Sequence, residues 1–348
     1  MTAGPVVLAV DSGGSGLRAV LAVDGRPRSA PLRSARPVRT GPQGIDADHF
    51  LEQLVPLARA LLADAQVTEV PAAAVGAAGM ATLGDRLRAE LPGALAREWG
   101  VRRLALAADA VTAYVGALGF RPGAVVAGGT GMIATGTDLV SWRRADGWGH
   151  LLGDCGGGAW IGRAGLDAAL RAHDGRRGGS AALLARAEAV FGPAPDLPGL
   201  LYPRSDRPAV LASFAPEVAA CAAEEVADPV AQDVLRRAAA HIVEAAAAVA
   251  PRSAQCEVAF TGGVFKMGAP LLDPLAEELA RQLPGARRTE AEGDPLLGSV
   301  RIATGLLTDG PGLPIDGRML SSLHTEADDE ERVFRAHSSG KSDESDKI

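Results

Sequence analysis

Short apolar runs of strand length alternate along the chain with stretches whose apolar residues recur at helical spacing. In the first third this pattern predicts strands at 5–10, 17–23 and 27–33, a helix at 48–64, a strand at 73–78, a helix at 85–98 and a strand at 103–107. The resulting order of three strands followed by helix, strand, helix and strand predicts a mixed sheet with helices packed on it.

The pattern restarts after residue 109. A helix at 110–118 precedes strands at 123–128 and 132–137, which are joined by a glycine turn as the first two strands are. We interpret this as a weak internal duplication of the kind that two similarly folded halves leave. The remaining elements are helical stretches at 158–190 and 208–250, a strand at 256–261, and helices at 270–283 and 295–308.

Length and composition refine this picture. The 348 residues suggest two or three domains, and 47% hydrophobic with 22% charged residues is typical of a globular protein. The 35 basic and 42 acidic residues give a net charge of −7, so the body offers no basic surface for nucleic acid. Residues 321–348 hold eight acids and four bases, and we expect 315–348 to form an acidic disordered tail.

Cysteine usage and hydropathy exclude further classes. The three cysteines, Cys155, Cys221 and Cys256, are widely spaced and form neither a disulfide framework nor a metal-binding pair. The N-terminus lacks the cationic start of a signal peptide, and no stretch approaches 18 uninterrupted apolar residues. The alanine-rich segment 238–250 is broken by polar residues and predicts a core helix. We therefore expect a cytoplasmic protein with no membrane partner.

The turn at 11–16, DSGGSG, carries the first candidate chemistry. Its glycines let backbone N–H groups approach an anion, and its serines add hydroxyl donors. Asp11, at the end of the first strand, can hold Mg²⁺ through water beside phosphates. An ordinary glycine-rich hairpin is the alternative. The turn lacks the lysine-ended P-loop pattern, and it leads into a strand rather than the helix that a Rossmann fingerprint requires.

Four further segments carry candidate chemistry. Asp109 follows a strand and can cap the next helix, or it can orient a substrate hydroxyl and accept its proton. A second glycine hairpin at 128–131 has the same phosphate-cradling character as the first. The many glycines of 147–158 imply close backbone approach to something, and Trp148 in this loop either lines a pocket or fills the core. The turn at 261–263 suits a flat ring lying on glycine backbone.

In this order and spacing, the segments DSGGSGLR, Asp109, AGGTG, GWGHLLGD and FTGGV resemble the motifs of the N-acetylglucosamine kinases. These kinases belong to the BadF/BadG/BcrA/BcrD ATPase family within the actin/hexokinase/Hsp70 superfold. The resemblance covers about residues 5–310. It implies a two-domain α/β fold of the actin/hexokinase (ribonuclease H-like) type, with mixed sheets flanked by helices and ATP in the interdomain cleft. The domains would be 1–115, to which the helix near 295–310 returns, and 116–294.

The resemblance also implies roles for individual residues in a transfer of the ATP γ-phosphoryl group to the 6-hydroxyl of N-acetylglucosamine. Asp109 would be catalytic, and Asp11 would hold the Mg²⁺. The residues implied to bind ATP are Gly13, Gly14, Ser15, Gly129, Thr130, Gly131, Gly262 and Gly263. The residues implied to bind the sugar are Asp109, Trp148, Gly149 and Asp154. Relatives are commonly homodimers, so a homodimer is implied as well.

Three departures from the family pattern bear on the sugar. The segment 38–41 lacks the usual sugar-contacting Asn, Cys155 replaces a Glu of the sugar loop, and Asp146 stands where relatives have small residues. A charged Asp146 could favour a free amine, which keeps glucosamine as a second candidate substrate. Two further functions stay open, an ATPase that activates a radical dehydratase and a sugar-sensing protein without kinase activity. Lys266, the single Lys of the body, either neutralises phosphate or is solvated.

Overall fold

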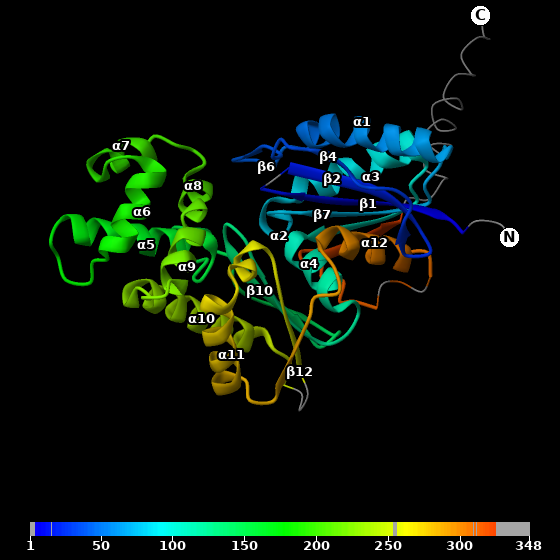
Figure 1. Ribbon diagram of the computed structural model, residues 1–348. Helices are drawn as coiled ribbons and strands as arrows, with labels where there is room; N and C mark the ends of the chain where they lie inside the picture. The colour runs from blue at the N-terminus through cyan, green and yellow to red at the C-terminus, as the bar shows by residue number, and fades with distance from the viewer. Residues whose placement is uncertain (1–3, 15, 253–255, 309, 311, 325–348) are drawn as a thin grey trace, which may run out of the picture.

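The protein folds around two β-sheets, seen in Figure 1 in a computed structural model that describes residues 4–14, 16–252, 256–308, 310 and 312–324. The first sheet has the strand order β14–β8–β7–β1–β2–β3, and β4 also pairs with β2. Its strands are β1 (Val6–Gly13), β2 (Gly16–Val23), β3 (Arg26–Pro27), β4 (Leu32–Ser34), β7 (Ala72–Ala77), β8 (Arg103–Ala108) and β14 (Leu320–His324). β1 pairs antiparallel with β2 and parallel with β7, which is parallel to β8.

The second sheet repeats this arrangement in the order β11–β10–β9–β12–β13. Its strands are β9 (Gly123–Gly128), β10 (Met132–Thr137), β11 (Trp142–Asp146), β12 (Cys256–Thr261) and β13 (Ala286–Thr289). On one side of β9 lie β10 and β11, joined by antiparallel pairing, and on its other side lie β12 and β13, which run parallel to it. The strands on the two sides of β1 in the first sheet are arranged in the same way. The strand order β3–β2–β1–β7–β8 is matched strand for strand, which confirms the predicted duplication.

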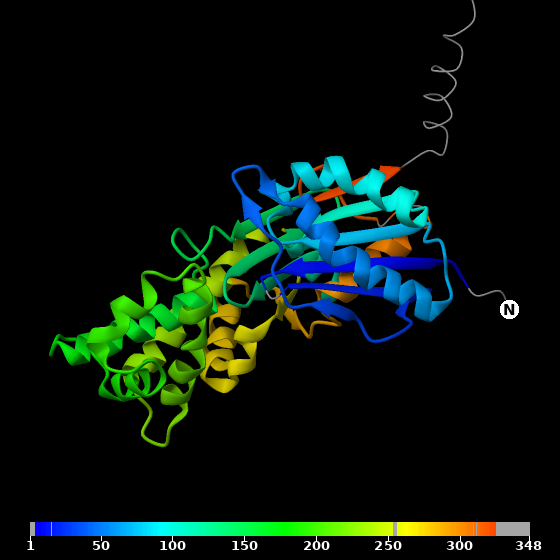
Figure 2. The same cartoon turned by 90° about the horizontal axis from the view of Figure 1, so that it is seen from above.

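One helix packs between the sheets, a second lies beside it on the first sheet, and two more cover the outer face of the first sheet. The helix α4 (Asp109–Leu118) contacts strands of both sheets, and α12 (Pro295–Gly305) packs on the first sheet beside it. Glycines permit this crossing, because a Cβ at Gly298 would collide with the Thr112 carbonyl oxygen and one at Gly116 with the Asp294 carbonyl oxygen. The outer helices α1 (Ala47–Ala65) and α3 (Asp85–Trp99) are drawn in blue and cyan over the sheet in Figure 2.

The second half carries most of the remaining helices. The helices that project from this half are α5 (Gly158–His173), α6 (Ala181–Phe191), α7 (Leu197–Leu201), α8 (Arg207–Ser213) and α9 (Ala215–Ala223), which Figure 2 draws in green. The long helix α10 (Pro229–Val249) packs against β9, β10 and β11 and against α11 (Ala269–Gln282). Shorter elements are α2 (Met80–Leu83), the β5–β6 hairpin (Thr40–Gly41 and Gly44–Ile45), and 3₁₀ turns at Ala194–Asp196 and Gly263–Met267. Among the described residues, no helix combines the length and apolar character needed to cross a membrane.

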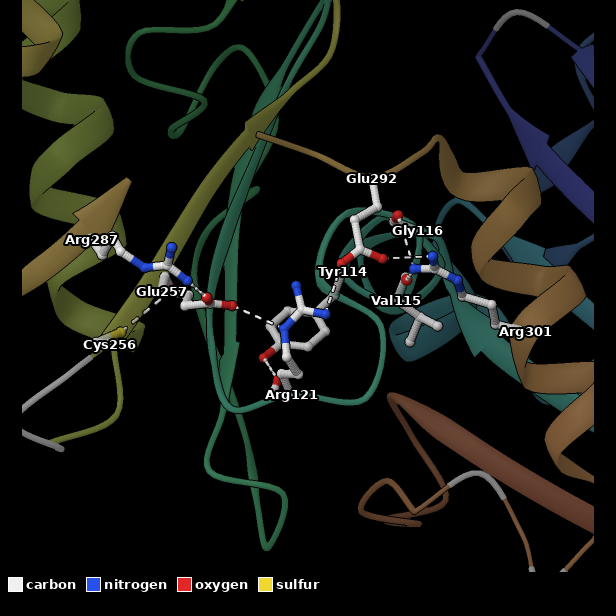
Figure 3. Close-up of polar contacts among 9 residues, drawn as sticks. All are labelled: Tyr114, Val115, Gly116, Arg121, Cys256, Glu257, Arg287, Glu292 and Arg301. Carbon is white, nitrogen blue, oxygen red and sulfur yellow. Dashed lines mark hydrogen bonds and ion pairs between the residues drawn. The ribbon is translucent and has the colours of Figure 1, made fainter. Parts of the chain in front are cut away.

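A chain of ion pairs ties together the two places where the backbone passes between the sheets (Figure 3). Arg121, in the α4–β9 connection, pairs with Glu257 of β12 at 3.0 Å and with Glu292 at 2.7 Å. Glu292, in the β13–α12 connection, pairs in turn with Arg301 at 2.6 Å. Arg301 also donates to the carbonyl oxygen of Val115 at 2.8 Å, near the C-terminus of α4.

The observed elements correct several predictions. The strands β11 and β13 were not predicted, and the helical stretches 158–190 and 208–250 are each divided into shorter helices. The prediction of disorder from residue 315 is wrong for Leu320–His324, which pairs antiparallel with β8 because that edge of the sheet is otherwise open. The rest of the expected tail, 325–348, lies outside the described residues. The domain boundary at residue 115 remains a prediction.

Candidate active site

The principal cavity, about 1000 Å³ in volume, opens where strands of the two sheets end. Its walls come from the carboxyl ends of β1, β7 and β8 on one side and of β9 and β12 on the other, the position at which open α/β sheets bind ligands. The sequence-predicted residues that line it are Asp11, Gly13, Gly14, Asp109, Gly129, Thr130, Gly131, Trp148, Gly149, Asp154 and Gly262. Gly263 is not among the lining residues, and Ser15 lies outside the described residues.

The first wall presents a carboxylate held by an arginine. Asp11 lies opposite Arg18 in the β1–β2 register, and Arg18 donates from Nη2 to Asp11 Oδ2 at 2.6 Å. The same guanidinium donates from Nη1 to Asp294 Oδ2 at 2.6 Å and so links β2 to the start of α12. Burial raises the pKa of Asp11, and the charge of Arg18 opposes that rise. No hydrogen bond from a described residue to Asp11 Oδ1 is present, so this oxygen is available to a cation.

Asp109 stands at the junction of β8 and α4. It is the first residue of the helix rather than its N-cap, a position that Ala108 takes without a side-chain hydrogen bond. The Ala110 N–H donates to Asp109 Oδ1 at 2.9 Å, which fixes the rotation of the carboxylate. Burial raises the pKa of Asp109, the nearby charge of Asp11 raises it further, and Arg144 partly offsets the rise. The carboxylate is thus a better proton acceptor than an exposed aspartate.

Three glycines of the two hairpins have no packing reason to be glycine. A Cβ added at Gly13, Gly14 or Gly129 would meet no atom within 4 Å, and none of the three has a left-handed φ. Because any L-residue would fit the fold there, the missing side chains leave room for a ligand to approach the backbone. The glycine turns of the two hairpins lie at the ends of β1 and β9, on opposite walls of the cavity. This arrangement suits an extended anion held from both sides.

Gly157 and Gly158 show which part of the chain is closely approached by the glycine-rich segment 147–158. The Gly158 N–H donates to the Gly129 carbonyl oxygen at 2.8 Å, and the Ala159 N–H donates to that of Thr130 at 2.9 Å. A Cβ at Gly157 would lie 2.7 Å from the Gly131 carbonyl carbon. The close backbone approach that these glycines permit is therefore to the second hairpin of the same chain, which they support from behind.

The 147–153 loop contributes an aromatic residue, and Asp154, which follows it, contributes a carboxylate. Trp148 does not fill the core, since it is 65% exposed at the cavity edge with the Arg144 guanidinium 4.5 Å from its ring centre. Asp154 accepts a hydrogen bond from the Gly149 N–H at 3.0 Å, and burial raises its pKa. Asp146 does not line the cavity, and both of its carboxylate oxygens accept backbone N–H groups. The interpretation that Asp146 reads a sugar amine therefore has no support in this geometry.

The turn after β12 separates two cavities. Gly262 lines the principal cavity with a φ of 108°, and a Cβ there would collide with the Gly128 carbonyl oxygen, so both conformation and packing require glycine. Gly263 lines a second cavity of about 310 Å³ together with Lys266. The other lining residues are Pro216, Ala219, Ala220 and Ala223 of α9, with Met267 and Pro270. Lys266 is exposed at this second cavity, not at the hairpins.

Sequence reasoning missed two cationic residues of the principal cavity, Arg18 and Arg144. Arg18 could have been found, because pairing Gly13 with Gly16 in the predicted strand–glycine turn–strand unit places Arg18 opposite Asp11. Arg144 carries no such signal, since the strand β11 that holds it was not predicted. Thr82 of α2 also lines the cavity. The described part of the chain holds no cluster of three metal-ligating side chains.

Comparisons with known proteins add to this geometry. A sequence model of the BadF/BadG/BcrA/BcrD ATPase family matches residues 8–303. The solved structure "Putative N-acetylglucosamine Kinase" from Chromobacterium violaceum is 29% identical with a TM-score of 0.66, covering 88% of this chain and 99% of that chain. A solved structure of the same name from Porphyromonas gingivalis is 16% identical with a TM-score of 0.63, covering 85% of this chain and 97% of that chain.

A ROK family glucokinase from Streptomyces griseus, solved with glucose and AMPPNP, is 21% identical with a TM-score of 0.51, covering 85% of this chain and 97% of that chain. A comparison with curated protein sequences found no match. The structural likenesses confirm the predicted two-domain α/β fold of the actin/hexokinase type.

Proposed function

The chain belongs to the BadF/BadG/BcrA/BcrD ATPase family, and we propose that it is a sugar kinase that transfers the γ-phosphoryl group of ATP to a hydroxyl of an amino sugar, N-acetylglucosamine above all. Support for the sugar kinase activity comes from the likeness to sugar kinases. Support for the amino sugar comes from the name of the 29% identical structure. We propose a 6-phosphate as the product.

The observation that carries the proposal is the position of one carboxylate between two open glycine hairpins. Asp109 lines the same cavity as Gly13 and Gly129, whose missing side chains nothing in the packing explains. Backbone N–H groups at such hairpins bind phosphate oxygens. A carboxylate beside them can receive the proton of a hydroxyl that attacks the terminal phosphorus. Phosphoryl transfer needs mainly this positioning and charge neutralisation.

ATP would lie across the cavity with its phosphates between the hairpins. Gly14 on one wall and Thr130 and Gly131 on the other would complete the phosphate contacts. Ser15, which lies outside the described residues, is proposed as a phosphate ligand from the sequence alone. Gly262 lines the principal cavity, and the next residue, Gly263, lines the second cavity, which is walled by small apolar side chains of α9. The nucleotide would pass from the first cavity to the second at these two glycines. We propose that the adenine ring occupies this second cavity, because a flat apolar ring fits against alanine and glycine.

The residues present fit Mg²⁺, which binds one or two carboxylates together with substrate phosphate oxygens and water. Asp11 would hold it, because Oδ2 is bound by Arg18 while no described residue donates to Oδ1. When bound, Mg²⁺ neutralises phosphate charge and polarises the phosphorus–oxygen bond. Arg18 opposes the rise that burial causes in the pKa of Asp11, and its hydrogen bonds to Oδ2 fix the orientation of the carboxylate.

Asp109 would accept a hydrogen bond from the sugar hydroxyl, orient it toward the γ-phosphorus and take its proton as the new bond forms. Asp154 would accept hydrogen bonds from other sugar hydroxyls, and Trp148 and Gly149 would bound the sugar pocket. Water would be displaced from the cavity when both substrates are bound, which suppresses hydrolysis of ATP.

A homodimer remains a prediction that the sedimentation coefficient of the purified protein tests.

A coupled assay of ADP release tests the proposal. Mg²⁺-ATP is supplied with N-acetylglucosamine, glucosamine, N-acetylmannosamine or glucose, and we expect N-acetylglucosamine to give the highest kcat/KM. Asp109→Asn is the control. Asparagine keeps the oxygen that accepts from Ala110, so the fold is preserved while the proton acceptor is lost, and kcat should fall by about 10²–10⁴-fold.

Two results would contradict the proposal. Release of ADP at one rate with and without sugar would indicate an ATPase. Binding of sugar without any turnover in Mg²⁺-ATP would indicate a sensor.

A further inference from the structure

The 147–153 loop is closed at its base by two aspartates, one at each end. Asp146 is the last residue of β11, and Asp154 follows the loop. Both have left-handed backbone conformations, with φ of 58° and 54° respectively. This conformation is uncommon for residues other than glycine, and strain of this kind concentrates at functional sites.

Asp146 uses its whole carboxylate inside the loop. Its Oδ1 accepts the N–H of Asp154 at 2.6 Å, and its Oδ2 accepts the N–H of Cys155 at 2.9 Å. A Cβ at Gly153 would collide with Oδ1, so a larger residue there would displace this carboxylate from its hydrogen bonds. The side chain of Asp146 thus determines the path of the backbone at 153–155.

The position of Asp154 depends on that path. Once its N–H is held, Asp154 directs its own Oδ1 to the Gly149 N–H at 3.0 Å. Its Oδ2 lies against Gly131, where an added Cβ would collide with it. Asp154 therefore connects the loop to the second hairpin, and its carboxylate reaches the cavity in one orientation.

This arrangement brings two carboxylates close together. The charge of Asp146 adds to burial in raising the pKa of Asp154. The repulsion between the carboxylates and the two left-handed backbone conformations both oppose folding. In return, the arrangement fixes the position of the Asp154 carboxylate.

We infer that Asp146 is a positioning residue for sugar binding, which acts through Asp154 and does not touch the sugar. The inference rests on the proposed function, in which Asp154 binds sugar hydroxyls. Because those hydroxyls are common to N-acetylglucosamine and glucosamine, loss of Asp146 should weaken both sugars alike. A residue that contacted the amino group would instead change the ratio between them.

The test is Asp146→Ala, with KM for each sugar, KM for ATP and sugar binding by calorimetry measured on the full chain. A displacement of a binding group by about 1 Å can cost about 10²-fold. We therefore expect KM to rise by about 10²-fold for both sugars, with KM for ATP within about twofold of the wild type.

Asp138→Ala is the matched control. Asp138 lies at the other end of the β10–β11 hairpin, where its Oδ1 accepts the N–H groups of Val140 and Ser141 at 3.0 and 2.8 Å. The Asp138→Ala change removes the same kind of contact, a carboxylate that accepts two backbone N–H groups, at a place outside the principal cavity. Its sugar KM should equal that of the wild type.

If both variants give the same sugar KM, the inference is wrong. A loss confined to glucosamine would also overturn it, since Asp146 would then read the amine. If Asp146→Ala does not fold, Asp146→Asn is measured, because its amide keeps one acceptor oxygen. A raised KM for both sugars supports the inference, and a wild-type KM overturns it. Failure of the proposed function is seen separately, as a wild type without sugar-dependent ADP release or sugar binding.

Discussion

At the scale of single residues, the two arginines of the cavity set the charge of its carboxylates. Arg18 is bound to Asp11, whereas Arg144 acts on Asp109 from a distance and lowers its pKa. Burial outweighs this effect, so the pKa of Asp109 stays above its usual value near 3.8. The ionised form of Asp109, the proposed proton acceptor, is therefore disfavoured by burial.

This predicts the acid side of the pH profile. Asp109 must be ionised to accept a proton, so kcat/KM should fall as pH falls through the raised pKa, above the range of an exposed aspartate. In Arg144→Gln the opposing charge is gone, the pKa rises further, and the fall should begin at higher pH. The midpoint of the acid limb is measured. A midpoint that stays in place in Arg144→Gln would contradict the assignment.

The open glycines make a second prediction at this scale. Gly129→Ala adds a methyl group that meets no atom of the chain within 4 Å, so the thermal midpoint should not fall. The same methyl group obstructs a phosphate, and loss of one hydrogen bond to a charged group should raise KM for ATP about tenfold or more. Gly199→Ala, equally open but in α7 outside both cavities, should leave KM for ATP unchanged and should likewise not lower the thermal midpoint. If Gly129→Ala has the wild-type KM for ATP, the second hairpin does not bind the phosphates of ATP.

At the scale of elements, the strands that sequence reasoning missed lie at sheet edges. β11 and β13 are the outer strands of the second sheet, and each carries two arginines, at 143–144 and 287–288. Charged side chains keep edge strands from pairing with other chains, but they also remove the apolar alternation by which strands are recognised. β14 was missed because five residues with two leucines give no pattern beside an acidic segment, and only the open edge of β8 makes it a strand.

The ion pairs of the crossover connections allow a prediction about elements. Arg121 lowers the pKa of Glu292, so this pair contributes to stability above the usual pKa of a glutamate and is lost as pH falls through the lowered pKa. Because the side chains are about 40% exposed, Glu292→Gln should reduce the free energy of unfolding by no more than about 1 kcal/mol at pH 7. The difference from the wild type should vanish near pH 3, where Glu292 is protonated in both states. Urea titrations at the two pH values measure it, and a difference that persists at pH 3 would contradict the pairing.

At the scale of the whole molecule, the order of motifs predicted more than their individual residues did. Each glycine hairpin alone is compatible with an ordinary turn, yet the duplicated strand order brings both to one cavity with Asp109. The sequence could not predict that Gly157 and Gly158 support the second hairpin, since a glycine indicates a close approach without identifying the group that is approached. It likewise could not place Asp146, whose role depends on hydrogen bonds eight and nine residues away.

The central claim is that this cavity joins the γ-phosphoryl group of ATP to a sugar hydroxyl. Phosphorus-31 NMR of the reaction with Mg²⁺-ATP and N-acetylglucosamine tests it most directly, because it separates the two acceptors that ADP release alone does not distinguish. We predict a sugar 6-phosphate in amounts equal to the ADP formed, and almost none with Asp109→Asn. Inorganic phosphate equal to the ADP, with no sugar phosphate, would contradict the account.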